Sequence, residues 1–294
     1  MKLLNCLKAA TLVAVAGLAA CATPGSGPTV VSYDHGALDT LVALGQRQRV
    51  LAVPKAGLPD YLAEVAAGLP DAGTLKVPDL AVLRTLAPDL ILITGRQGES
   101  AEALARIARV REVGLADGDF REALATKVMG LAALYGAEAR ARDQLDDLWR
   151  HVARQREALP AGIRALVITH NGGRYSLRRE PVVSELLGLV PPAIPDAVEP
   201  VRRGTRVFYP VTAEDLAAMA PEVVLVVDRS AAIGQAPLPR GELERALASA
   251  GAGDIRVGYL DPRLWYLSGA GLVSVKRQVD EVVGILVTSS RNRG

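Results

Sequence analysis

Short runs of consecutive apolar residues alternate along this chain with segments whose apolar residues recur every three or four positions. The first pattern predicts strands buried on both faces of a sheet, and the second predicts helices that bury one face. We expect strands at 30–31, 50–53, 90–93, 113–115, 166–170, 223–227 and 257–261. We expect helices at 37–44, 61–67, 80–86, 101–107, 182–188, 216–219, 242–250 and 273–287. Strands that alternate with helices in this way predict an α/β protein.

The segment 120–159 departs from this alternation, because it contains no proline and keeps a helical spacing of apolar residues. Gly136 interrupts it, so we expect two helices, the second from 137 to about 158 and roughly 33 Å long. The predicted architecture is therefore two Rossmann-like β/α lobes, at 29–118 and 160–294, with connecting helices at 119–159. A single long spine helix joins the lobes, and a ligand cleft lies between them. Such a stiff connection permits only small closing motions, which favours a protein that captures a ligand and hands it on.

Two stretches that begin 133 residues apart are nearly the same. Residues 87–96 read Ala-Pro-Asp, an apolar strand and Arg96, and residues 220–229 read Ala-Pro-Glu, an apolar strand and Arg229. Each follows a short helix pattern, and open α/β sheets bind ligands at the carboxyl ends of their strands. The repeat therefore predicts two similar lobes that direct Arg96 and Arg229 at one shared cleft.

The first 20 residues have the features of a secretory signal. Lys2 and Lys8 precede a short apolar run, and small residues precede Cys21. We interpret Cys21 as the lipidated first residue of the mature chain and 21–28 as its flexible tether. A signal peptide without lipidation is the alternative. The protein is expected to be exported to the periplasm or cell envelope, touching the membrane only through its lipid.

Charge and cysteine content narrow the function further. The formal net charge is +2, and the signal segment carries two lysines and no acid, so the mature chain is expected to be near neutral. A near-neutral protein is not a general nucleic-acid binder. Removal of the signal leaves Cys21 as the only cysteine, so we expect no internal disulfide, no cysteine metal site and no intrinsic cofactor. We expect a monomer.

Several motifs stand in a characteristic order, and together they resemble one protein family. They are the lipobox ending at Cys21, the segment 33–41, the stretch from Pro88 to Gln97, the Asp-Arg-Ser-Ala-Ala-Ile-Gly segment at 228–234, and Tyr-Leu-Asp-Pro at 259–262 followed by Trp-Tyr-Leu at 265–267. The chain resembles the periplasmic or lipid-anchored substrate-binding proteins of iron–siderophore ABC importers, in particular the catecholate branch. The resemblance implies a class III periplasmic-binding-protein fold, a ferric siderophore as ligand and an ABC permease as partner.

The resemblance also implies which residues surround the ligand. Arg96, Arg229 and Arg179 match three arginines around the iron–catecholate centre, with Arg178 as the rival of Arg179. Tyr266 matches a tyrosine that binds ferric iron directly. A histidine that usually accompanies this tyrosine is absent, because its place reads Val-Arg-Arg-Gly at 201–204.

The chemistry of such a ligand agrees with these residue types. Ferric iron held by three catecholates carries about three negative charges, and guanidinium is the weakly hydrated, multi-donor cation suited to burying them. Trp265 and Tyr266 are suited to packing on aromatic ligand rings. A surface arginine that caps a loop is the simpler interpretation of Arg96 or Arg229 taken alone. A core position is the simpler one for Trp265 and Tyr266.

Four further residues are weaker candidates. His35 and His170 each follow a predicted strand, so either is a candidate iron ligand in place of the absent histidine, although a hydrogen-bonded loop histidine is commoner. Asp39 and Glu185 hold similar places in the two lobes, and in the wider family one acid per lobe docks on the permease. The simpler interpretation of both acids is a solvated helix face.

Two other functions remain open at this stage. A haem or cobalamin carrier of the same fold is one, since Tyr266 is also a possible haem ligand. An exported α/β enzyme is the other, but the chain has no Gly-x-Ser-x-Gly, His-Glu-x-x-His or phosphate-loop motif. The leading prediction is a non-enzymatic protein that captures a ferric catecholate siderophore and delivers it to an ABC importer.

Overall fold

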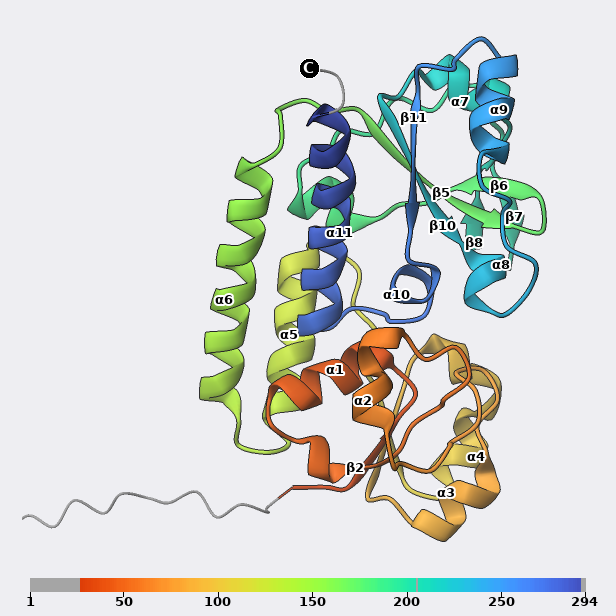
Figure 1. Ribbon diagram of the computed structural model, residues 1–294. Coiled ribbons are helices and arrows are strands. Elements are labelled where there is room, and N and C mark those ends of the chain that lie inside the picture. The colour runs from red at the N-terminus through yellow and green to blue at the C-terminus, as the bar shows by residue number, and fades with distance from the viewer. Residues whose placement is uncertain (1–26, 205, 292–294) are drawn as a thin grey trace, which may run out of the picture.

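The structure, a computed structural model, describes residues 27–204 and 206–291. The predicted signal segment and Cys21 lie outside these residues. Two α/β lobes stack end to end, and long helices run along one side of both (Figure 1). The predicted two-lobed α/β architecture is confirmed.

The N-terminal lobe contains a four-stranded parallel sheet in the order β2-β1-β3-β4. Its strands are β1 (Val30–Ser32), β2 (Val50–Ala52), β3 (Leu90–Ile93) and β4 (Arg109–Glu112). Its α-helices are α1 (His35–Ala43), α2 (Ala63–Ala66), α3 (Leu80–Leu86) and α4 (Ala101–Ala105), and its 3₁₀ turns are η1 (Arg47–Arg49), η2 (Asp60–Leu62) and η3 (Gly95–Ser100). The strand expected at 113–115 is wrong, because β4 ends at Glu112.

The C-terminal lobe contains a five-stranded mixed sheet in the order β11-β10-β5-β6-β9 and a separate β7-β8 hairpin. Its strands are β5 (Ala165–Asn171), β6 (Arg174–Leu177), β7 (Val201–Arg203), β8 (Arg206–Phe208), β9 (Pro210–Val211), β10 (Val223–Asp228) and β11 (Arg256–Leu260). Its helices are α7 (Ala213–Met219), α8 (Arg229–Ala232), α9 (Glu242–Ser249), α10 (Pro262–Tyr266) and α11 (Leu272–Arg291), with a π-helical turn η4 (Val182–Leu186).

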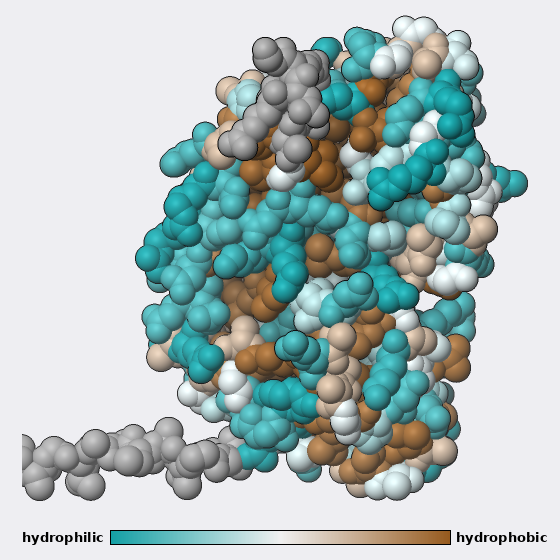
Figure 2. Space-filling view, viewed as in Figure 1, coloured by the Kyte–Doolittle hydropathy of each residue, from teal (hydrophilic) through white to brown (hydrophobic). Residues whose placement is uncertain are grey.

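The connection between the lobes is a layer of helices. Helix α6 (Glu138–Glu157) spans both lobes, α5 (Phe120–Ala132) packs beside it, and α11 returns along the same layer (Figure 1). Only the inner face of α6 is buried, through Ala141, Leu145, Leu148 and Val152. Its outer face is hydrophilic on the left of Figure 2. The predicted spine helix therefore exists, and α5 and α11 share its role.

One hydrophobic core belongs to both lobes. It includes Leu90 and Leu92 of β3, Val223 and Leu225 of β10, and the inner faces of α5, α6 and α11. The alternate residues of β3 and β10 face separate outer cores, which explains why both strands are apolar throughout. Opening the lobes widely would expose part of the shared core, so the fold favours small motions.

The sequence repeat is a structural repeat. Ala87 after α3 and Ala220 after α7 are the only non-glycine residues with positive φ in the described chain, at 44° and 47°. The acid two residues later also acts alike in both copies. Asp89 accepts a hydrogen bond from the Thr29 N–H beside β1, and Glu222 accepts one from the Arg164 N–H beside β5. In both copies the acid thus holds the start of its strand against the start of the neighbouring strand, and the arginine follows at the other end of the strand.

Candidate functional site

Arg96 and Arg229 meet at the side chain of Tyr266. Arg96 lies in η3 after β3, where Thr94 and Gln97 form a capping box, and Arg229 begins α8 after β10. Their guanidinium carbons lie 5.7 Å and 5.6 Å from the centroid of the Tyr266 ring. The structure thus brings together, from opposite lobes, the two arginines of the repeat and the tyrosine of the predicted site.

Hydrogen bonds fix this arrangement. An Arg96 Nη2–H donates to the Tyr266 carbonyl oxygen at 2.6 Å, and Arg229 Nε–H donates to the Tyr266 hydroxyl at 2.8 Å. The ring's negative π faces attract guanidinium cations as well. No ion pair includes Arg229 within the described residues. The Arg229 guanidinium is therefore positioned by neutral polar groups, and its positive charge is available to an anion.

Three successive contacts, from the end of β5 and the turn after it to the end of β10 and the start of α8, position Arg229. Asp228 pairs with His170, an Arg229 Nη1–H donates to Asn171 Oδ1 at 2.7 Å, and the Gly172 N–H donates to Ser230 Oγ at 2.9 Å. The sequence identified 171–173 only as a turn, so Asn171 was missed. Its position could have identified it, because Asn171 ends an apolar strand that neighbours β10, the strand that precedes Arg229.

His170 is a structural residue of this network. It is 3% exposed, its Nδ1–H donates to Asp228 Oδ1 at 2.8 Å, and its Nε2 accepts from the Gly173 N–H at 3.0 Å. Burial alone would raise the pKa of Asp228, but hydrogen bonds from His170, Leu238 and Ala231 outweigh it and lower that pKa. Both ring nitrogens are occupied, so the structure does not support His170 as an iron ligand.

His35 is fully buried at the start of α1. Its Nε2–H donates to the Pro54 carbonyl oxygen at 3.4 Å, and its Nδ1 has no hydrogen-bond partner among the described residues. Burial lowers the pKa of His35 to about 4, so its ring stays neutral at physiological pH. A side chain without solvent access cannot bind iron in the cleft, which corrects its candidacy as a metal ligand. The described residues contain no group of three or more potential metal-binding side chains.

Trp265 also differs from the prediction. Its side chain is buried, and its Nε1–H donates to Glu281 Oε2 of α11 at 2.6 Å. Burial raises the pKa of that carboxyl group. The indole therefore anchors α10 to α11 inside the core, and only the backbone of Trp265 contributes polar atoms to the site.

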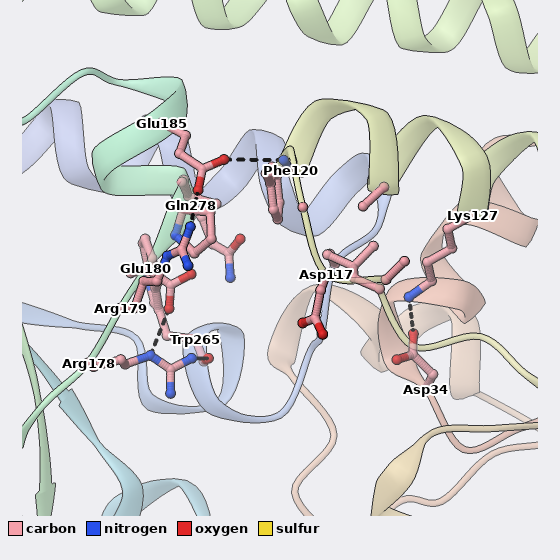
Figure 3. A pocket seen from close by; sticks show the side chains of 18 residues that line it. Asp34, Asp117, Phe120, Lys127, Arg178, Arg179, Glu180, Glu185, Trp265 and Gln278 are labelled. Atoms are coloured by element: carbon pink, nitrogen blue, oxygen red, sulfur yellow. Dashed lines mark hydrogen bonds and ion pairs between the residues drawn. The ribbon is translucent and has the colours of Figure 1, made fainter. Parts of the chain in front are cut away.

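Arg178 and Arg179 lie beside a cavity of about 430 Å³ between the lobes. Figure 3 shows both on one wall of that cavity, with Glu180 and Glu185. Arg178 Nε–H donates to Glu180 at 2.7 Å, and an Nη2–H donates to the Trp265 carbonyl oxygen at 3.1 Å. Arg179 is 81% exposed and pairs with Glu185 at 3.1 Å. Arg178 binds the carbonyl oxygen of the residue before Tyr266, so it is better placed than Arg179 to be the third arginine of the site.

A buried ion pair forms the opposite wall of the cavity (Figure 3). Lys127 Nζ of α5 lies 2.9 Å from Asp34 Oδ1, and the two side chains are 3% and 8% exposed. Asp34 also caps α1 by accepting from the Ala37 N–H. Lys127 could have been found from the sequence, because it falls on the apolar face of its helix beside Leu124 and Val128.

The two acids proposed for permease docking are engaged inside the protein. Asp39 is 1% exposed and accepts hydrogen bonds from Tyr61 and from the Val273 and Ser274 N–H groups. Glu185 accepts from the Phe120 N–H, the first residue of α5, and from Arg179. Asp39 is inaccessible to a partner, which corrects its predicted docking role. The Glu185 carboxylate lies in the cavity wall, where both of its oxygens already accept hydrogen bonds.

Comparisons with known proteins agree on one family. A family model described as periplasmic binding protein matches residues 30–240. The petrobactin-binding protein YclQ of Bacillus subtilis (strain 168) is 29% identical over 268 residues, which cover 88% of this chain and 82% of YclQ. The crystal structure of YclQ is similar with a TM-score of 0.79 at 28% identity, covering 89% of this chain and 93% of that one.

Two further relatives extend the comparison. The structure of the iron uptake ABC transporter substrate-binding protein PiuA from Streptococcus pneumoniae Canada MDR_19A has a TM-score of 0.76 at 25% identity, covering 87% of this chain and 92% of that one. The ferric-anguibactin-binding protein FatB of Vibrio anguillarum (strain ATCC 68554 / 775) is 24% identical over 231 residues, which cover 72% of this chain and 68% of FatB.

Within the described residues, no helix is long and apolar enough to cross a bilayer.

Proposed function

The chain belongs to the periplasmic binding protein family, and from that premise we propose that it captures a ferric catecholate siderophore between its lobes and delivers it to an ABC importer. The names of its relatives support an iron-loaded ligand, since YclQ is a petrobactin-binding protein and FatB a ferric-anguibactin-binding protein. Those names describe what the relatives bind, so the ligand proposed for this chain rests on the chemistry of its own site.

The convergence of Arg96 and Arg229 on Tyr266 is the observation that carries the proposal. A ferric tris-catecholate presents several anionic oxygens around one metal. Two guanidinium groups from opposite lobes, with Arg178 as a third, can hydrogen-bond such oxygens and offset their charge. The Tyr266 ring provides a flat surface for an aromatic ligand ring, and its hydroxyl is a hard donor suited to ferric iron.

Ligand binding exchanges weaker contacts for stronger ones. In the structure, the last carbonyls of α10, those of Trp265 and Tyr266, accept hydrogen bonds from Arg178 and Arg96. Carbonyl groups at a helix C-terminus carry partial negative charge and hold the cations in place. An anionic catecholate oxygen is a stronger acceptor than a neutral carbonyl. The arginines are thus already close to a binding arrangement, which reduces the entropy lost on binding.

The finer parts of the proposal concern the setting of the protein. We infer an extracytoplasmic location with lipid attachment at Cys21, a monomeric state and an ABC permease as partner. Binding without turnover agrees with the shared core, which limits the lobes to small motions. No resident cofactor is part of the proposal, and the ferric iron arrives and leaves with the ligand.

Tryptophan fluorescence offers a direct test. The chain has two tryptophans, Trp149 on α6 and Trp265 beside Tyr266. A Trp149→Phe background leaves Trp265 as the sole reporter next to the site. We expect a ferric tris-catecholate to quench it at sub-micromolar concentration, whereas free catechol does not. Haemin added in the same way tests the haem alternative, and a response to haemin alone would replace the siderophore.

Arginine variants in this background test the placement of the site. Arg96→Ala and Arg229→Ala each remove charge-assisted hydrogen bonds and should weaken binding by about 1–3 kcal/mol, or roughly 5- to 150-fold. Arg150→Ala is the control, because Arg150 is an exposed arginine of α6. Unchanged affinity in both site variants would contradict the proposed site. A visible spectrum of the complex with wild type and Tyr266→Phe then reports whether the phenolate enters the iron shell.

A further inference from the structure

A second cavity, of about 350 Å³, lies within the C-terminal lobe. Its apolar lining comes from Leu166 and Val167 of β5, Leu177 of β6, Val183 of η4, Ile194 and Val207. We call this cavity the apolar groove. Its volume is near the lower end of the roughly 300–1,000 Å³ of ligand pockets, so it suits part of a ligand.

Two residues that line the apolar groove are exposed and apolar, and they belong to a segment rich in such residues. The described chain exposes seven large hydrophobic residues, and five of them lie between 190 and 208, namely Val190, Ile194, Val201, Val207 and Phe208. Ile194 is 43% exposed and Val207 is 41% exposed, and both line the groove. Exposed apolar residues gathered around a cavity mark a binding site more often than scattered ones do.

The apolar groove adjoins the cavity between the lobes. Arg178, Arg179 and Glu180 line both this groove and the cavity between the lobes. The Arg178 guanidinium donates to the carbonyl oxygen of Trp265, the residue before Tyr266. Arg178 therefore lies between the residue next to Tyr266 and the apolar groove, so a ligand whose iron centre lies against Tyr266 would reach the groove past Arg178.

We propose that the apolar groove binds an alkyl arm of the same ligand, so that the protein selects an amphiphilic ferric catecholate. The arginines and Tyr266 hold the anionic head, and the groove removes the chain from water. This inference rests on the proposed function for the identity of the head. The inference that the ligand carries an alkyl arm rests separately on the apolar residues that line the groove.

Two ferric complexes that differ only in chain length test the inference. They are made from the N-methyl and N-octyl amides of 2,3-dihydroxybenzoic acid and titrated against the Trp149→Phe protein. We expect the octyl complex to bind at least tenfold more tightly than the methyl complex. Ile194→Asp and Val207→Asp place a charge on the groove rim at exposed positions, and each should reduce this ratio to near one. Val77→Asp is the matched control in the N-terminal lobe, where Val77 is 66% exposed, and should keep the ratio.

The outcomes separate this inference from the function on which it rests. A ratio near one in the parent protein, or a ratio that survives both groove variants, overturns the groove while leaving siderophore capture intact. Failure of both ferric complexes to bind overturns siderophore capture. Calorimetry with N-octyl-2,3-dimethoxybenzamide, whose methylated oxygens hold no iron, then decides the groove by itself. Binding that the two rim variants abolish supports the groove, and absence of binding overturns it.

Discussion

Asp39 makes the stability of this protein depend on pH in a direction opposite to that of most carboxylates. Its Oδ1 accepts from the Val273 N–H at 3.2 Å, and its Oδ2 accepts from the Ser274 N–H at 2.9 Å and the Tyr61 hydroxyl at 3.0 Å. A carboxylate of α1 thereby caps α11. Burial raises the pKa of Asp39 to about 6, although the three hydrogen bonds oppose that shift.

The sign of the effect follows from proton binding. The folded state holds the Asp39 proton more tightly than the unfolded chain, whose aspartate titrates near its ordinary value of 3.8. The contribution to stability is therefore fully present below pH 3.8 and is lost as the pH rises through 6. Linkage gives a loss of about 2 kcal/mol between pH 4 and pH 7 for a pKa difference of this size.

Asp39→Asn removes this titration while keeping the shape of the side chain. The Tyr61 hydroxyl can turn toward Ser268 Oγ, which lies 3.4 Å away, and accept from the new amide. The Ser274 N–H then loses its acceptor, at a cost of about 1–3 kcal/mol. We expect the variant to be less stable than wild type by that amount at pH 4. At pH 7 we expect the two free energies of unfolding to be within about 1 kcal/mol.

Urea denaturation of both proteins at pH 4, 5, 6 and 7, followed by circular dichroism, measures the difference. Taking the difference cancels the other titrating groups. Asp143→Asn is the control, since Asp143 is exposed on α6, and it should follow wild type at every pH. A wild-type advantage over Asp39→Asn that stays constant, or grows, from pH 4 to pH 7 would refute the buried, proton-binding state of Asp39.

Two further predictions concern stability and use the same denaturation assay at pH 7. Ala87→Gly and Ala220→Gly should each stabilise the protein by about 0.5–1 kcal/mol, because relief of the left-handed conformation exceeds the added entropy of the unfolded chain. Ala125→Gly within α5 should instead destabilise it by about 1 kcal/mol, and a loss in all three would contradict the strain at the repeat. Lys127→Met should cost about 3–5 kcal/mol, since it leaves Asp34 buried without its cation. The double variant Lys127→Met/Asp34→Asn should recover part of that loss, and a double variant no more stable than Lys127→Met would show that the charge of Asp34 is not the cause.

The internal repeat was the most reliable guide in the sequence. It predicted two like lobes, the strands β3 and β10, and two arginines that the structure brings to one tyrosine. These features depend on local pattern and on the rule for sheet edges, which a sequence expresses directly. The repeat also predicted the α3 and α7 turns, although it did not reveal their left-handed alanines.

The errors arose where long-range contacts decide the outcome. Asp39 looked like the solvated position of a short helix, but its partners Val273 and Ser274 lie more than 230 residues away. Trp265 looked suited to a ligand ring, yet Glu281 of α11 gives its indole a partner in the core. Strand β4 was misplaced because Arg109 and Arg111 interrupt its apolar pattern at the edge of the sheet. No local pattern carried this information.

The position of α11 has a consequence for the order in which the chain can fold during synthesis. Helix α1 belongs to the first lobe, but α11, near the end of the chain, covers it and supplies the partners of Asp39. A nascent chain that stops before Leu272 therefore lacks the surface on which its first helix packs. The first lobe can therefore bury this face of α1 only after the last helix has been synthesised.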